Sequence, residues 1–122
     1  MNEQYVARVE EVLDKLAPLV VERAVSVRQP TDSVLVIRVD LRFLDGARFE
    51  GNEIWAGGRR KYRFHLMDSK GALVWRLDNA PHHPEVRTHP HHRHAPGERV
   101  EESPPVTLEE ALLLLGRSEM RR

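Results

Sequence analysis

Apolar residues recur along the chain with two different periods, a helical one near the N-terminus and a period of two from residue 19 to residue 79. Near the N-terminus the apolar positions have helical spacing, and charged side chains lie between them. These apolar positions are Tyr5, Val9, Val12, Leu13 and Leu16. The pattern predicts a helix over residues 1–17, which Pro18 ends because proline lacks the N–H that a helix interior requires.

From residue 19 to residue 79 the period falls to two, which is typical of strands with one buried face. The clearest run is 33–43, where apolar positions alternate with Arg38, Asp40 and Arg42. Short turn sequences separate this run from the following ones: Asp45-Gly46, Gly57-Gly58 and Ser69-Lys70-Gly71. Four or five consecutive strands joined by such turns predict an antiparallel meander.

The composition changes after Asn79. Residues 80–105 contain six of the eight prolines and six of the seven histidines, which predicts a long His/Pro-rich loop. Thr107 and Glu110 then have the spacing of a capping box, and they predict a helix over residues 107–116 that Gly116 ends. Its run 111–115 is apolar on nearly all sides, so it either packs heavily or meets a partner. The expected fold class is α+β: residues 1–122 form a single domain with one sheet and a helix at each end.

Composition narrows the class of protein. A chain of 122 residues supports one modest core. The absence of cysteine excludes disulfide scaffolds, thiol nucleophiles and zinc sites built from cysteine. No apolar run approaches the roughly 20 residues that a membrane helix needs, and the N-terminal sequence MNEQYVARVEEV is not a signal peptide. We therefore expect a cytoplasmic protein of bacterial type that does not enter a membrane.

The formal net charge is zero, but the histidines are concentrated in one part of the chain. All seven lie between His65 and His94, and six of them lie between His82 and His94. Acidic and basic residues cancel from Asp78 to Arg99, so the local charge depends on histidine protonation, which changes near neutral pH. Prolines stiffen the backbone around these histidines.

Three interpretations of this histidine-rich segment compete. The first is a metal site for zinc or nickel, because neutral imidazole is a common ligand of both; its candidate ligands are His89, His91, His92 and His94. The second is acid–base cleavage of a phosphodiester, which needs two histidines of opposite protonation and a cationic clamp. The third is an exposed segment without chemistry. Asp78 and Asn79, at the end of a predicted strand, can orient an imidazole.

The second interpretation assigns two groups of residues. The candidate catalytic residues are His65, Asp78, His82, His83, His91, His92 and His94. The candidate substrate-binding residues are Tyr62, Arg76, Asn79, Arg87 and Arg93. His65 joins the first group because it alternates away from Tyr62, Phe64 and Leu66, and is therefore expected on the sheet face beside the loop.

A basic run, Arg59-Arg60-Lys61 with Tyr62 and Arg63, is a further candidate surface. It can follow a phosphate backbone, with Tyr62 or Trp75 stacking on a base, or it can be the solvated start of a strand. For self-association the candidates are a free sheet edge and the run Leu112 to Leu115, and either can form a homodimer.

Several of these segments resemble the TumE family, small bacterial and archaeal proteins described as toxins of toxin–antitoxin pairs. The matching segments are Tyr62-Arg63-Phe64-His65 with Asp68, then residues 76–85 (RLDNAPHHPE), then residues 90–94 (PHHRH). The sequence departs from the family pattern at Phe64, Leu66, Leu77 and His89. The resemblance implies an antitoxin partner with a DNA-binding helix-turn-helix.

The resemblance does not supply a chemical mechanism. Toxins of this size commonly act on RNA, so a metal-independent ribonuclease becomes the leading hypothesis by analogy of class. A metal-binding protein and a non-catalytic interaction module are the alternatives.

Overall fold

The N-terminal helix forms as its pattern predicts. In the computed structural model, which describes residues 2–117, helix α1 spans Asn2–Leu16 and buries the five apolar residues that define its pattern. Pro18 lies in a 3₁₀ turn, η1 (Ala17–Leu19), that redirects the chain into the first strand. No helix among the described residues is long and apolar enough to cross a membrane.

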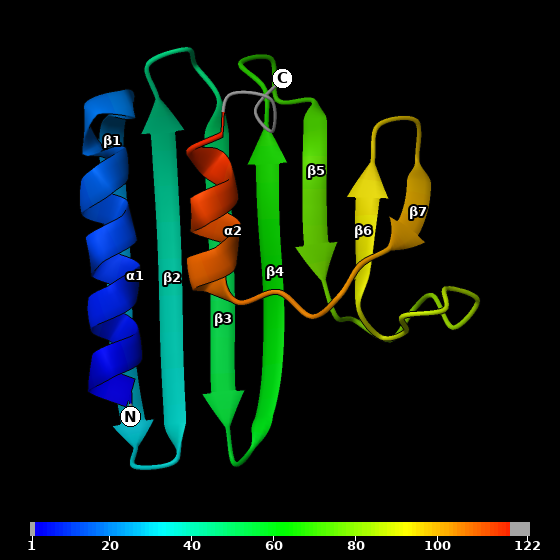
Figure 1. Ribbon diagram of the computed structural model, residues 1–122, viewed down its shortest axis with the longest axis horizontal. Helices are drawn as coiled ribbons and strands as arrows, with labels where there is room; N and C mark the ends of the chain where they lie inside the picture. Colours follow the sequence, from blue (N-terminus) through cyan, green and yellow to red (C-terminus); the bar gives the residue numbers. More distant parts are fainter. Residues whose placement is uncertain (1, 118–122) are drawn as a thin grey trace.

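The strands form one antiparallel sheet in which every strand pairs with its neighbours in the sequence, from β1 to β7 (Figure 1). The first five strands are β1 (Val20–Thr31), β2 (Val34–Phe43), β3 (Arg48–Ala56), β4 (Arg59–Met67) and β5 (Leu73–Asp78). Two more follow, β6 (His92–Ala95) and β7 (Arg99–Glu102). The predicted α+β meander is therefore confirmed.

The strand count and the extent of the loop differ from the prediction. The sheet has seven strands instead of four or five, because β6 and β7 lie inside the segment expected to be a loop. Aliphatic alternation did not reveal β6, since its four residues are His92, Arg93, His94 and Ala95. The strand is nevertheless anchored, because His92 and Ala95 are buried.

Both helices cover the same face of the sheet, which leaves the other face open (Figure 1). Helix α2 (Leu108–Leu115) begins with the predicted capping box of Thr107 and Glu110. Four of its apolar side chains are buried, whereas Leu113 is 49% exposed, so the apolar run packs mainly inside the protein. Gly51 on β3 permits this packing, because a Cβ there would lie 3.1 Å from Leu108 Cδ1.

A buried carboxylate ties the helices to the sheet. Glu53 on β3 is fully buried and accepts hydrogen bonds from the Tyr5 hydroxyl, from Arg60 Nη1 at 3.1 Å and from the Leu108 backbone N–H at 3.0 Å. Burial, and then the neighbouring carboxylate, raises the pKa of Tyr5. Arg60 also donates to the Val106 carbonyl and lies over the Tyr62 ring, so it belongs to the interior and not to a basic surface run.

Candidate active site

The open face of the sheet brings distant residues into two lateral rows. In the first row His65 on β4 lies opposite Arg76 on β5, which lies opposite His94 on β6. In the second row Asp78 lies between Arg63 and His92. The expectation that His65 shares a face with the histidine segment is confirmed by this register. Burial, followed by Arg63 and Arg76, lowers the pKa of His65.

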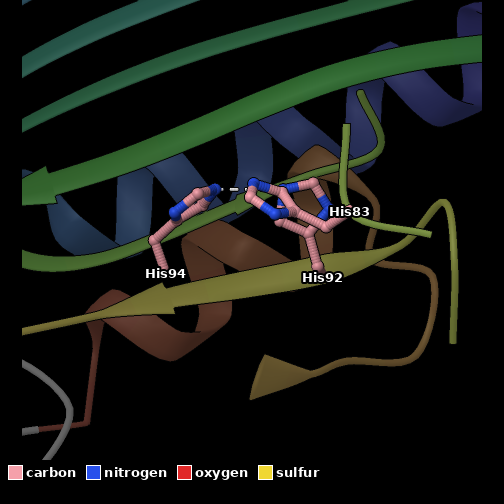
Figure 2. A group of neighbouring side chains, drawn as sticks. All are labelled: His83, His92 and His94. Carbon is pink, nitrogen blue, oxygen red and sulfur yellow. Dashed lines mark hydrogen bonds between the residues drawn. The ribbon is translucent and has the colours of Figure 1, made fainter. Parts of the chain in front are cut away.

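Three imidazoles meet at the β6 end of this face. His92 and His94 project from β6, and His83 approaches them from the preceding loop (Figure 2). One ring nitrogen of each lies within 4.8 Å of the others. The ring centroids are 4.9 Å apart for His83 and His92, and 4.8 Å apart for His92 and His94. We call these three residues with Asp78 and Arg76 the histidine cluster.

His92 is the buried member, and its hydrogen bonds fix its role. Its ring is 2% exposed, and its Nδ1 donates to the Pro90 carbonyl at 2.9 Å, because a carbonyl can only accept. Its Nε2 lies 3.0 Å from Asp78 Oδ1 and 3.0 Å from His94 Nε2. The nitrogens of His92 thus link the Pro90 carbonyl on one side to the Asp78 carboxylate on the other, and the ring lies directly against His94.

His94 has the opposite character. Arg76 Nη2 lies 3.0 Å from His94 Nε2, and since an arginine can only donate, this nitrogen is an acceptor. Burial, followed by the charge of Arg76, lowers the pKa of His94 to about 4. His94 is consequently a neutral base at physiological pH. Asp78 Oδ2 is 3.6 Å from the same nitrogen.

His83 lies at the solvent side of the cluster, where its partner is an acid. Its Nδ1 lies 3.2 Å from Glu85 Oε1, and its side chain is 29% exposed. The pKa of Glu85 is lowered by its own backbone amide and then by the bond to His83. The cluster thus contains one histidine beside an acid and another beside an arginine.

A groove gives access to this pair. Its volume is about 530 Å³, and Arg76, His83, His94 and Glu98 form its polar side. Apolar residues complete the lining, among them Leu73, Pro96 and Val100. A larger basin of about 690 Å³ lies over β1–β3, but its lining residues include no histidine and three of its four arginines are paired, as in Arg42 with Glu22. Chemistry therefore selects the smaller groove.

Comparison with known protein families matches residues 9–117 to the family described as Toxin TumE. The chain belongs to the TumE toxin family. No individual curated protein and no solved structure gives a significant match. Membership of a toxin family implies an antitoxin as partner. The whole histidine cluster lies within the matched residues.

Other residues that we singled out as candidates lie apart from the cluster of this TumE-family protein. His82 and His89 are exposed loop residues. His91 stacks on Tyr62, with Nδ1 2.8 Å from the phenol oxygen, and Tyr62 is part of the core beneath the helices. The proposed metal set of His89, His91, His92 and His94 is therefore not brought together; the structure instead groups His83 with His92 and His94.

The remaining candidates for substrate binding have structural partners. Asn79 accepts from the Tyr62 backbone N–H and donates to the Arg60 carbonyl, which extends the pairing of β4 with β5. Arg87 forms two hydrogen bonds with Glu102 at the surface. Arg93 lies opposite Leu77 and so faces the helix side. Among the predicted binding residues, only Arg76 lines the groove.

The contact of Glu85 with His83 was not predicted from the sequence. The position of Glu85 two residues after His83 was the available signal, since a short loop can bring such side chains into contact. The apolar wall of the groove was also missed, because Leu73, Pro96 and Val100 come from segments that meet only when β5, β6 and β7 pair.

Proposed function

We propose that this TumE-family toxin cleaves RNA by metal-independent acid–base chemistry at the histidine cluster. The observation that carries the proposal is the pairing of two groove-lining histidines with partners of opposite charge: His94 with Arg76, and His83 with Glu85. Acid–base catalysis requires one protonated and one unprotonated group at the same pH, and the proposal assigns these roles to His83 and His94, respectively.

In the proposed reaction His94 is the general base and His83 is the general acid. His94 accepts the proton of a ribose 2′-hydroxyl, and the freed oxygen attacks the adjacent phosphorus. The bond from phosphorus to the 5′-oxygen breaks, and His83 gives its proton to that leaving oxygen. The products are a 2′,3′-cyclic phosphate and a 5′-hydroxyl. Arg76, beside His94 in the groove, stabilises the charge on the non-bridging phosphate oxygens.

His92 and Asp78 act behind the groove as positioning residues. Both are nearly fully buried, at 2% and 5% exposure, so they are not available to contact a substrate directly. Asp78 accepts from the Ala80 backbone N–H and holds His92, whose ring in turn lies against His94, with the two Nε2 atoms 3.0 Å apart. These contacts fix the ring of His94 beside Arg76, and Nε2 is free to act as the base once Arg76 turns to the phosphate.

A cleavage assay with the purified toxin tests the proposal. We expect EDTA-resistant cleavage of single-stranded RNA that leaves a cyclic phosphate, and a loss of about 10²–10⁴-fold in rate for His94→Ala or His83→Ala. His82→Ala and His89→Ala are matched controls, because both rings are exposed and lie outside the cluster. Equal rates in all four variants would remove the cluster from the reaction.

A metal centre is the second candidate function, favoured by the close approach of His83, His92 and His94. These nitrogens, with an oxygen of Asp78, offer the donor set that zinc or nickel prefers. Metal analysis of untagged protein purified without a chelating resin separates the two candidates. A stoichiometric metal that His92→Ala and His94→Ala both lose would favour this centre over metal-independent cleavage.

We propose two protein partners for the toxin. The first is a cognate helix-turn-helix antitoxin in the cytoplasm, as the family resemblance implies.

The second is another copy of the chain, joined through the free edge of β1. An antiparallel pairing centred on Val25 would set Glu22 of each copy opposite Arg28 of the other. Light scattering on the wild type and on Val25→Pro, which removes a strand N–H, tests this dimer. A monomeric wild type would refute the pairing.

A further inference from the structure

The basic run in the sequence is divided between the two faces of the sheet. Arg60 and Tyr62 point to the helix side, where Arg60 binds Glu53. Arg59, Lys61 and Arg63 alternate with them along β4 and are exposed. Because Arg63 lies opposite Asp78, these three residues share the open face with the histidine cluster. We call Arg59, Lys61 and Arg63 the β4 strip.

The cations of the β4 strip are available to a ligand. On β3, the residue opposite Lys61 is Ile54 and the residue opposite Arg63 is Asn52, so neither position supplies a carboxylate. On β2, by contrast, the arginines of this face are paired, for example Arg38 with Asp40 at 3.0 Å. Within residues 2–117, no ion pair of 4.0 Å or less involves a member of the β4 strip.

The spacing of the strip suits an extended polyanion. Alternate residues of a strand are about 6.6 Å apart, so the three cations form a regular row along β4. The next alternate position is His65, which lies between Glu50 on β3 and Arg76 on β5, and Arg76 in turn lies opposite His94. The row therefore leads directly to the groove. Ile54, 37% exposed, and half-buried Val36 lie beside Lys61 and offer an apolar surface to a sugar or base.

From this arrangement we infer that single-stranded RNA binds along β4, with successive phosphates on Lys61 and Arg63 and the reacting phosphate at Arg76. This inference rests on the proposed function, because it identifies the binding path of the same substrate. An acidic segment of a protein partner is a competing ligand for such a strip. The regular spacing and the continuation into the groove favour RNA.

Binding is measured without cleavage, by fluorescence anisotropy with a short labelled 2′-O-methyl RNA that lacks the attacking hydroxyl. We expect the double variant Lys61→Gln/Arg63→Gln to bind about tenfold or more weakly. The slope of log K against log salt should become shallower by about 1.4, since each phosphate contact on a single strand contributes about 0.7. The matched control is Lys15→Gln/Arg8→Gln, which removes the same charges from α1 on the opposite side of the sheet.

The outcomes separate this inference from the proposed function. Unchanged RNA affinity in the β4 double variant, or an equal loss in the α1 control, would overturn the β4 path while leaving cleavage at the cluster intact. A wild type that does not bind the RNA would overturn it as well. Antitoxin binding that falls in the β4 variant while RNA binding does not would assign the strip to the protein partner. Conversely, strip-dependent binding with undiminished cleavage by His83→Ala and His94→Ala would uphold the path and refute the mechanism.

Discussion

The sheet contains two buried carboxylates that pair with an arginine, one on each face, and their surroundings differ. Glu53 binds Arg60 at 3.1 Å beneath the helices, and Asp78 binds Arg76 at 3.3 Å on the open face. The other donors to Glu53 are a tyrosine hydroxyl and a backbone N–H. The other partners of Asp78 are the imidazoles of His92 and His94, and three members of that cluster, Arg76, His83 and His94, line a groove.

A carboxylate–arginine pair does not by itself indicate whether a site is structural or catalytic. Around Glu53 every donor is fixed and enclosed, so the arrangement can only stabilise the contact between helices and sheet. Around Asp78 the donors are titratable imidazoles linked to a surface groove, so a proton can be passed to or from a substrate. Access and exchangeable protons, not the ion pair itself, distinguish a candidate active site.

Glu53→Ala should have the largest effect on stability, because it removes the buried carboxylate that ties the helices to the sheet. The change leaves the Arg60 charge, whose side chain is 14% exposed, without its carboxylate, and it leaves the Leu108 N–H without an acceptor. Breaking a buried ion pair on one side costs about 3–5 kcal/mol, and we expect a loss of that size in the free energy of unfolding by urea. Where this variant does not fold, Glu53→Gln retains an acceptor and is expected to lose less. A loss below about 1 kcal/mol in both variants would contradict the assignment.

Asp78→Asn tests the pair on the open face, and it should lower the rate of RNA cleavage more than the stability. Asparagine preserves the shape of the side chain but removes the charge that holds His92 and, through it, His94. We expect RNA cleavage to slow by about 10²-fold, which corresponds to about 2.7 kcal/mol of transition-state stabilisation. The pH–rate profile should shift as well, because the bases of the cluster lose their carboxylate. A purely structural role would lower the amount of folded protein without moving that profile.

His94, beside Asp78, and Tyr5, beside Glu53, should make stability depend on pH at opposite ends of the pH scale. The pKa of His94 falls from 6.5 in the unfolded chain to about 4 in the folded protein, so between these values the unfolded chain binds the extra proton. Stability should therefore decline as the pH falls from about 6.5 to about 4. Tyr5 has a raised pKa, so its contribution is present below its unfolded value and declines as the pH rises above it.

Urea unfolding of metal-free protein at a series of pH values measures both limbs. We expect His94→Gln to flatten the acidic limb only, because this variant removes the titrating group and leaves Tyr5 unchanged. His82→Gln is the matched control, since His82 is exposed. An acidic limb that His94→Gln leaves as steep as in the wild type would contradict the linkage.

The sequence allowed the first part of the fold to be predicted and concealed the last part. Strand β2 and the placement of His65 followed from a period of two, which one buried face imposes locally. Strand β6 escaped prediction because its open-face residues are imidazoles, whose polar character resembles that of a loop. The cluster depends on the register of Asp78 with His92, which is set by how residues 79–91 close and not by local pattern.

The inward direction of Arg60 was hidden for a related reason. Glu53 has a core position on β3, and only the docking of α1 and α2 provides the donors that make a buried carboxylate tolerable there. Those donors, Tyr5 and the Leu108 backbone, lie far from Glu53 in the sequence. Charge alone therefore indicated a surface run, whereas tertiary contacts assign alternate members of the run to opposite faces.

A third carboxylate–arginine pair, Arg87 with Glu102, is neither buried nor part of the groove. Its loss should have the smallest effect on stability and on cleavage. Arg87 bonds Glu102 at 2.9 and 3.0 Å, but its side chain is 80% exposed. Exposed pairs contribute little to stability, so Arg87→Ala should leave the midpoint of urea unfolding nearly unchanged. Cleavage should remain within about twofold of wild type, because Arg87 is not among the residues that line the groove. A tenfold loss of cleavage at unchanged stability would show that the substrate extends beyond the groove to the β7 edge, and would return Arg87 to the binding residues.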